Sequence, residues 1–81
     1  MRLDKYLKVS RLIKRRTVAN EACDGERVMV NGRQAKASYQ VKPGDIIEIG
    51  YANRVLKVEV VQVEEHVAKA SASALYREIA E

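Results

Sequence analysis

Apolar side chains near the start of the chain recur with the period of an α-helix. Leu3, Tyr6 and Leu7 would share one face of such a helix, and lysines would occupy the opposite face. The pattern therefore predicts a helix over residues 3–9. We expect a break near Ser10, because a longer helix would place a leucine in the middle of its basic face.

A second short helix is predicted over residues 18–24, with the sequence VANEACD. Thr17 is of a type that caps helix N-termini. Val18 and Ala22 lie four residues apart, so both can face the first helix. Gly25 follows, and a glycine at this place can end the helix in a left-handed conformation.

After the second helix the pattern changes to the alternation expected of β-strands. The pair Asn31-Gly32 is the strongest short signal for a hairpin, and Pro43 with Gly44 indicates another turn. In the last predicted strand the alternation shifts phase, which predicts a bulge near residues 60–61. The predicted strands are residues 27–30, 46–49 and 54–63.

Helical spacing returns at the end of the chain and predicts a terminal helix over residues 68–80. The apolar residues at this spacing are Ala72, Leu75, Tyr76 and Ile79. The order of elements predicts an α+β fold with two N-terminal helices packed on a small antiparallel sheet, plus a C-terminal helix. A chain of 81 residues suits one domain. We assign residues 1–65 to it and expect the helix in residues 66–81 to pack on it or extend it.

Basic residues are concentrated in the first half of the chain. The net charge is +4, but residues 1–44 hold eleven Lys and Arg against four Asp and Glu, whereas residues 45–81 hold four against seven. Seven basic residues and one acidic residue lie within residues 1–16. Such crowding costs free energy until a polyanion neutralises it, which favours a phosphate-bearing partner. A solvated charged face without a partner is the alternative.

Two places along the chain are candidate phosphate contacts. Arg15 and Arg16 lie beside the start of the second helix, whose N-terminus also favours anions, so we predict a phosphate-binding locus there. Arg33 and Lys36 follow the hairpin turn and form a second basic element. Taken alone, this second element indicates only a hairpin.

The candidate chemistry for catalysis or metal binding is sparse. Cys23 and His66 are the only cysteine and histidine, and together they cannot supply the four ligands of a structural zinc site. A nucleophilic Cys–His pair would need a third orienting group and a pocket. We therefore expect Cys23 to be a small buried residue on a helix, and we expect no enzyme activity, no metal and no cofactor.

Other classes of protein fit less well. A single cysteine favours a reducing, cytoplasmic setting, the first twenty residues are too charged for a signal peptide, and no apolar run approaches the length of a membrane span. A basic membrane-surface helix would need a broader apolar face. A DNA-binding helix-turn-helix protein also has two helices and basic residues, but its recognition helix needs exposed side chains for base edges. The second helix here is short and net negative.

Several separated motifs resemble the RNA-binding domain named after ribosomal protein S4 of the small subunit. They are Arg2-Leu3-Asp4, Arg16-Thr17, Ala22 with Gly25, Val28 to Gly32, Lys36, and Lys42 to Asp45. The resemblance covers residues 2–49 and implies the αL motif of that family. The catalytic domains to which this domain is often attached do not fit in 81 residues, so the stand-alone bacterial members are the relevant comparison.

The stretches RLDKYLKVSRLIKRRTVA and NGRQAKAS are similar to stand-alone members that act in ribosome quality control. That resemblance implies binding to rRNA and to P-site peptidyl-tRNA on obstructed large ribosomal subunits, while a partner, RqcH, directs C-terminal alanine tailing. The stand-alone heat-shock protein of the same domain family is the alternative. It typically carries a longer basic C-terminal extension, whereas the last third of this chain is net negative. We expect a monomer away from the ribosome.

The resemblance also implies which basic residues contact RNA. By their place in the motif, the first candidates are Arg2, Arg15 and Arg16. The next candidates are Lys5, Lys8, Arg11 and Lys14. Asp4 is interpreted as an internal partner for a nearby arginine or a backbone amide.

Overall fold

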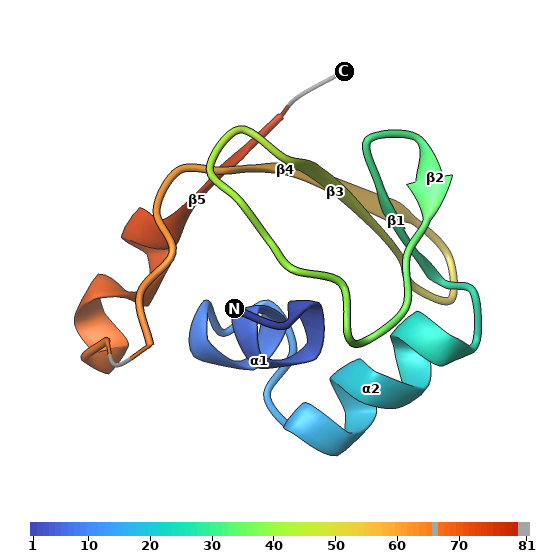
Figure 1. Ribbon diagram of the computed structural model, residues 1–81, viewed down its shortest axis with the longest axis horizontal. Helices are drawn as coiled ribbons and strands as arrows, with labels where there is room; N and C mark the ends of the chain where they lie inside the picture. Colours follow the sequence, from blue (N-terminus) through green and yellow to red (C-terminus); the bar gives the residue numbers. More distant parts are fainter. Residues whose placement is uncertain (66, 80–81) are drawn as a thin grey trace.

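Two helices cover one face of an antiparallel sheet in the computed structural model, which describes residues 1–65 and 67–79 (Figure 1). Helix α1 spans Leu3–Val9 and helix α2 spans Arg16–Asp24. The predicted α+β class and both N-terminal helices are confirmed. Helix α1 ends at Val9 with Ser10 as its C-cap residue, where the break was expected, and the chain reverses through Arg11, whose φ of 66° lies in the left-handed region.

The sheet has five strands in the order β2-β1-β3-β4-β5, and all neighbouring strands are antiparallel. The strands are β1 (Val28–Val30), β2 (Arg33–Gln34), β3 (Ile46–Gly50), β4 (Val55–Val60) and β5 (Tyr76–Glu78). Strands β2 and β5 form the two edges, and both are short, which limits pairing with other chains.

The Asn31-Gly32 turn joins β1 to β2 as predicted. Its residues have φ values of 54° and 80°, the pair of positive angles that a type I′ turn requires. The turn pairs Val30 with Arg33. Asn31 also accepts the Ile46 N–H on its side-chain oxygen at 2.9 Å, which ties the hairpin to the start of β3.

The predicted turn at Pro43 and Gly44 is also present. The Asp45 N–H donates to the Lys42 carbonyl at 3.1 Å, and Gly44 has a φ of 93°. Proline followed by a residue with positive φ is the signature of a type II turn. The Gly44 N–H donates to the Val60 carbonyl at 2.8 Å, so the turn is fastened to β4.

The core lies between the helices and the inner face of the sheet. Leu3, Tyr6 and Leu7 of α1 are fully buried, and Cys23 of α2 is buried as expected. Replacing one of the fully buried leucines by alanine would cost about 2–5 kcal/mol. The buried strand residues opposite them are Val28, Val30, Ile47, Ile49, Val58 and Val60.

Helix α2 begins earlier than predicted. Arg15 is the N-cap residue, in an extended conformation, and no side chain caps this end of the helix. Thr17, the predicted cap, therefore lies inside the helix. Arg15 and Arg16 therefore belong to the helix start itself, which lies two residues nearer the basic segment than predicted.

The end of α2 also differs from the prediction. Gly25 has a φ of −85°, and the left-handed residue is Glu26, with a φ of 65°. The Glu26 N–H donates to the Cys23 carbonyl at 3.2 Å, and the next N–H along the chain, that of Arg27, donates to the Ala22 carbonyl at 2.9 Å. These two bonds make a Schellman motif. Gly25 is needed for space instead, because a Cβ there would lie 2.9 Å from the Glu21 carbonyl oxygen.

The predicted α-helix over residues 68–80 is wrong for the part that the structure describes, and residue 80 lies outside it. Residues Lys69–Leu75 form a 3-10 helix, η1, and strand β5 follows and pairs with β4. The predicted strand over 54–63 correspondingly ends at Val60. The N–H groups of Val61 and Gln62 both donate to the Leu75 carbonyl, at 2.9 and 3.1 Å. Two amides on one carbonyl are the pattern of a bulge, one residue beyond its predicted place.

Candidate nucleic-acid interface

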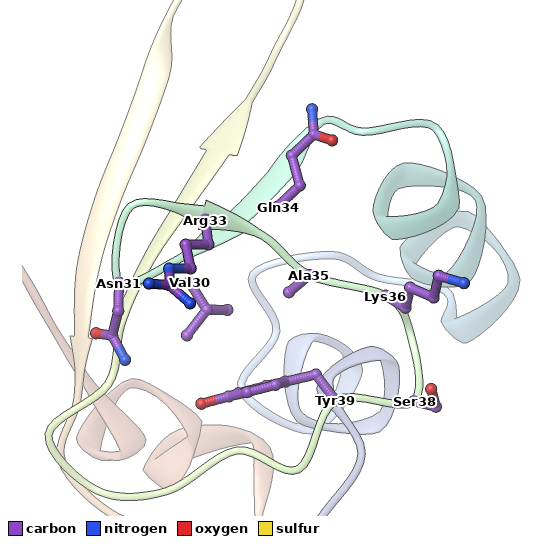
Figure 2. Close-up of a pocket in the computed structure, with 8 residues that line it drawn as sticks. All are labelled: Val30, Asn31, Arg33, Gln34, Ala35, Lys36, Ser38 and Tyr39. Carbon is purple, nitrogen blue, oxygen red and sulfur yellow. The ribbon is translucent and has the colours of Figure 1, made fainter.

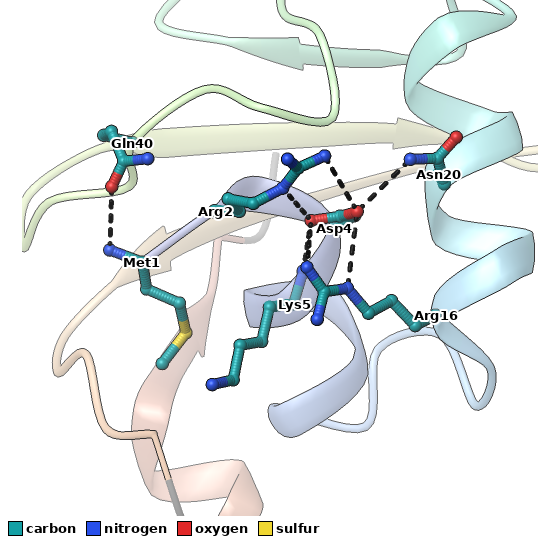
Figure 3. Close-up of polar contacts among 7 residues, drawn as sticks. All are labelled: Met1, Arg2, Asp4, Lys5, Arg16, Asn20 and Gln40. Carbon is teal, nitrogen blue, oxygen red and sulfur yellow. Dashed lines mark hydrogen bonds and ion pairs between the residues drawn. The ribbon is translucent and has the colours of Figure 1, made fainter.

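Asp4 lies at the centre of a polar cluster that joins the two helices (Figure 3). Its Oδ1 accepts the Lys5 N–H at 2.8 Å and lies 3.2 Å from the Arg2 Nε; its Oδ2 lies 3.4 Å from the Arg16 Nε. Asn20 donates to the Asp4 Oδ2 at 3.2 Å. We call Arg2, Asp4, Arg16 and Asn20 the Asp4 cluster. The structure agrees with the interpretation of Asp4 as a partner of arginines and a backbone amide.

The Asp4 carboxylate keeps its charge within this cluster. Burial alone would raise the pKa of Asp4, but hydrogen bonds from Arg2, Asn20, Arg16 and the Lys5 amide outweigh burial and leave the pKa below its ordinary value. One negative charge therefore lies between two guanidinium groups and reduces their repulsion.

The two arginines of the cluster remain available to solvent. The Asp4 side chain is 3% exposed, whereas those of Arg2 and Arg16 are 45% and 48% exposed. An arginine has five N–H donors in a planar fork, and a carboxylate occupies only part of them. The cluster thus holds two guanidinium groups in a defined orientation while leaving donors that can reach phosphate oxygens.

The other cations of the first sixteen residues are arranged differently. Lys5 turns away from Asp4 in Figure 3 and approaches Glu65 at 3.4 Å. Four further side chains are exposed and form no ion pair with any residue that the structure describes; they are Lys8, Arg11, Lys14 and Arg15. Residues 10–15, which we call the basic turn, connect α1 to α2. Uncompensated positive charge therefore extends from the end of α1 to the start of α2.

The second basic element borders a shallow concavity of about 670 Å³ (Figure 2). Arg33 reaches back over this concavity, and Lys36 points away from it, so the two cations are not gathered at one point. Tyr39 closes one wall and donates its hydroxyl to Asp45 at 2.9 Å. Asn31 donates to the same carboxylate at 3.1 Å.

The loop that carries Lys36 packs against the start of α1. The Leu3 N–H donates to the Tyr39 carbonyl at 2.8 Å, and the Asp4 N–H donates to the Ala37 carbonyl at 3.2 Å. These bonds hold the loop at the N-terminal end of α1, and Lys36 also borders a concavity shared with Cys23 and Asp24 at the end of α2. The chain thus presents two basic regions on one core, joined through the N-terminal end of α1.

Sequence reasoning missed the role of Asn20. It lies four residues after Arg16, so both side chains leave α2 on one face and reach the same carboxylate. That spacing is visible in the sequence. Its meaning depends on which face of α2 meets α1, and the fold supplies that information.

The structure offers little for other chemistry. No group of three or more His, Cys, Asp and Glu residues that could hold a metal occurs among the described residues, and His66 lies outside them. Burial raises the pKa of the Cys23 thiol to about 11, so the thiol stays protonated and unreactive near neutral pH. Within residues 1–65 and 67–79, no helix has the length and apolar character needed to cross a membrane.

A family model and several curated proteins match more than half of the chain. Residues 1–47 match the S4 domain family. The chain is 54% identical over 76 residues to the "RQC P-site tRNA stabilizing factor" of Halalkalibacterium halodurans, covering 94% of this chain and 86% of that protein. It is 49% identical to the protein of the same name from Streptococcus pneumoniae, covering all of this chain and 92% of that protein.

Two solved structures share the whole fold. One, described as the trimeric structure of Vibrio cholerae Heat Shock Protein 15, has a TM-score of 0.91 at 31% identity, covering 99% of this chain and 82% of that chain. The other, the solution structure of the hypothetical protein HP1423, has a TM-score of 0.84 at 31% identity, covering 100% and 99%. The chain therefore belongs to the S4-domain proteins and, among them, to the family of RQC P-site tRNA stabilizing factors.

Proposed function

We propose that this protein stabilises tRNA in the P site during ribosome quality control, by binding rRNA and peptidyl-tRNA on obstructed large ribosomal subunits. The observation that carries the proposal is the similarity to factors named for this role: about half of the aligned residues are identical, over nearly the full length of the chain. The two oriented arginines of the Asp4 cluster support it, because they form a preformed site for phosphate. In this proposal RqcH then directs C-terminal alanine tailing while the tRNA is held.

The mechanism is electrostatic and steric. A small rigid body that contacts two RNA surfaces lowers the free energy of the tRNA position that allows both contacts. A differential affinity of about 1.4 kcal/mol shifts that equilibrium tenfold. Recognition depends mainly on RNA shape and phosphate spacing.

The first test is co-sedimentation of an Arg16→Ala variant with purified large subunits that carry peptidyl-tRNA. We expect an affinity loss of about tenfold or more with the fold retained, since Asp4 keeps Arg2, Asn20 and the Lys5 amide. Arg77→Ala is the matched control, because Arg77 is an exposed arginine on the edge strand β5, paired with Glu59. Equal binding of both folded variants would contradict the proposal.

Crosslinking in cells followed by sequencing of the bound nucleic acid tests the identity of the partner. We expect large-subunit rRNA together with tRNA. Recovery of duplex DNA would favour a DNA-binding protein instead, and scattered mRNA would contradict a ribosomal role.

The likeness to Heat Shock Protein 15 supports a second candidate function, binding to free large subunits that carry a nascent chain on tRNA. The two functions differ in their dependence on RqcH. Loss of alanine tails in cells that lack this protein would support the quality control role. Unchanged tailing with preserved subunit binding would favour the second candidate.

A further inference from the structure

The β3–β4 hairpin reaches the basic turn through one tyrosine. The Tyr51 hydroxyl donates to the Leu12 carbonyl at 3.2 Å, and the two residues are 39 positions apart in the chain. The Tyr51 N–H donates to the Arg54 carbonyl at 2.8 Å and closes the hairpin loop. Burial raises the pKa of the Tyr51 hydroxyl, so it remains a donor near neutral pH.

Arg54 is held over the ring of the same tyrosine. Its guanidinium carbon lies 5.6 Å from the centre of the Tyr51 ring, within the range of a cation–π contact. Arg54 is exposed and has no ion pair among the residues that the structure describes. A guanidinium group stacked on a ring keeps its N–H donors along its edge, where a phosphate can accept from them.

The local hydrogen bonds explain why the tyrosine matters to the turn. Within the turn, the Arg11 N–H donates to the Lys8 carbonyl at 3.1 Å, and the Ile13 N–H donates to the Leu7 carbonyl at 3.0 Å. Both bonds lead back to α1. Among the described residues, the Tyr51 hydroxyl supplies the bond that ties the turn to the β3–β4 hairpin, and the Arg54 guanidinium group lies over the same tyrosine ring.

The geometry points to Arg54 as a further phosphate contact, which extends the RNA-binding surface of the basic turn onto the β3–β4 hairpin, and to Tyr51 as the residue that positions both. The inference rests on the proposed function, because it needs RNA at the basic turn. It adds a residue from the net-negative half of the chain that neither charge distribution nor motif position indicates. A guanidinium group in contact with an aromatic ring loses less rotamer freedom on binding than one without such a contact.

The test is the salt dependence of binding to purified large subunits that carry peptidyl-tRNA, measured for the full chain. We expect Arg54→Gln to weaken binding about three- to tenfold and to reduce the magnitude of the log–log salt slope by about 0.7–0.9, the value for one lost phosphate contact. Arg77→Gln is the matched control, since it also removes an exposed arginine, but one that lies on edge strand β5 and not in the β3–β4 hairpin loop. We expect its slope to equal that of the wild type.

A Tyr51→Phe variant separates positioning from charge. It keeps the ring and every cation, so we expect weaker binding with an unchanged slope and faster amide hydrogen exchange within the basic turn. Urea unfolding checks that the variant is folded. If the Arg54→Gln and Tyr51→Phe variants both bound like the wild type, this inference would be overturned and the proposed function would stand. A wild-type slope near zero would overturn the proposed function and this inference with it.

Discussion

Asp4 holds together two guanidinium groups that would otherwise repel each other. Its side chain is 3% exposed and contacts Arg2, Arg16 and Asn20. Removing one partner of a buried charged cluster leaves the others without compensation. The residue thus links stability to the orientation of the two arginines that we propose as phosphate contacts.

An Asp4→Asn variant tests this link. The amide keeps the size of the side chain but loses its charge, so both arginines lose their carboxylate. Because the arginines are about half exposed, we expect the free energy of unfolding to fall by only about 1–3 kcal/mol, measured by urea denaturation. Affinity for large subunits should fall about tenfold as the arginines lose their orientation. Asp24→Asn removes an exposed acid from α2 and should leave both quantities near the wild-type values.

Asp45 predicts how stability responds to acid. Burial would raise its pKa, but hydrogen bonds from the Lys42 amide, Tyr39 and Asn31, together with the charge of Lys42, hold the pKa below its ordinary value. A carboxyl with a lowered folded pKa stabilises the fold fully above its unfolded pKa of about 3.9, and the contribution is lost as pH falls through the folded pKa.

We therefore expect the wild type to lose stability between about pH 5 and pH 2, and an Asp45→Asn variant to lose less over the same interval. Urea unfolding at a series of pH values measures both. Since an amide nitrogen replaces one of the two carboxylate oxygens that accept from three donors, the variant should be less stable than the wild type at pH 7. Parallel pH curves for the two proteins would show that Asp45 is not responsible for the acid response.

The C-terminal end of α2 has its glycine one residue before the left-handed position. Glu26 occupies a φ of 65°, where an L-residue with a Cβ is strained by about 1 kcal/mol relative to glycine. We expect Glu26→Gly to raise the free energy of unfolding by about 0.5–1 kcal/mol. Gly25→Ala should lower it, because its Cβ would meet the Glu21 carbonyl. A stabilising Gly25→Ala would contradict the assignment of the two roles.

The elements that sequence reasoning predicted well are those with local causes. Helix α1 follows from the spacing of three apolar residues, and the hairpin follows from the backbone freedom of Asn31 and Gly32. Residues Tyr76–Glu78 also carry a helical pattern, but the free edge of β4 offers hydrogen bonds that a helix would leave unused. Whether this segment forms a helix or a strand depends on its pairing with β4, which lies at least 16 residues away in the chain. The spacing of apolar residues within the segment carries no information about that pairing.

The candidate site also combines features with local causes and features that depend on contacts between distant residues. The concentration of cations in the first sixteen residues was visible from the sequence, as was the pairing of Asp4 with an arginine or an amide. The contacts of Asn20 with Asp4 and of Tyr51 with Leu12 join residues 16 and 39 positions apart. Such contacts arise only when α1, α2 and the β3–β4 hairpin pack together, so residue types alone did not indicate them.

The two basic regions are carried by one small molecule, which measures 28 × 28 × 22 Å. The Asp4 cluster with the basic turn forms one region, and Arg33 with Lys36 forms the other. The loop that carries Lys36 is hydrogen-bonded to the start of α1, so neither region can move far without the other. A protein built this way can hold two RNA surfaces at a fixed separation.

Salt dependence tests whether both regions bind RNA at once. If about six phosphates are neutralised, the log–log slope for binding to large subunits with peptidyl-tRNA should be about −4 to −5. Replacing both Arg33 and Lys36 by glutamine should reduce its magnitude by up to about 2, because two contacts are lost. These residues share no described hydrogen-bond partner with Arg16. Adding Arg16→Ala to this double variant should therefore cost the same binding free energy as it does in the wild type, within about 0.5 kcal/mol. An unchanged slope in the double glutamine variant would confine RNA binding to the N-terminal region and exclude a bridge between two RNA surfaces.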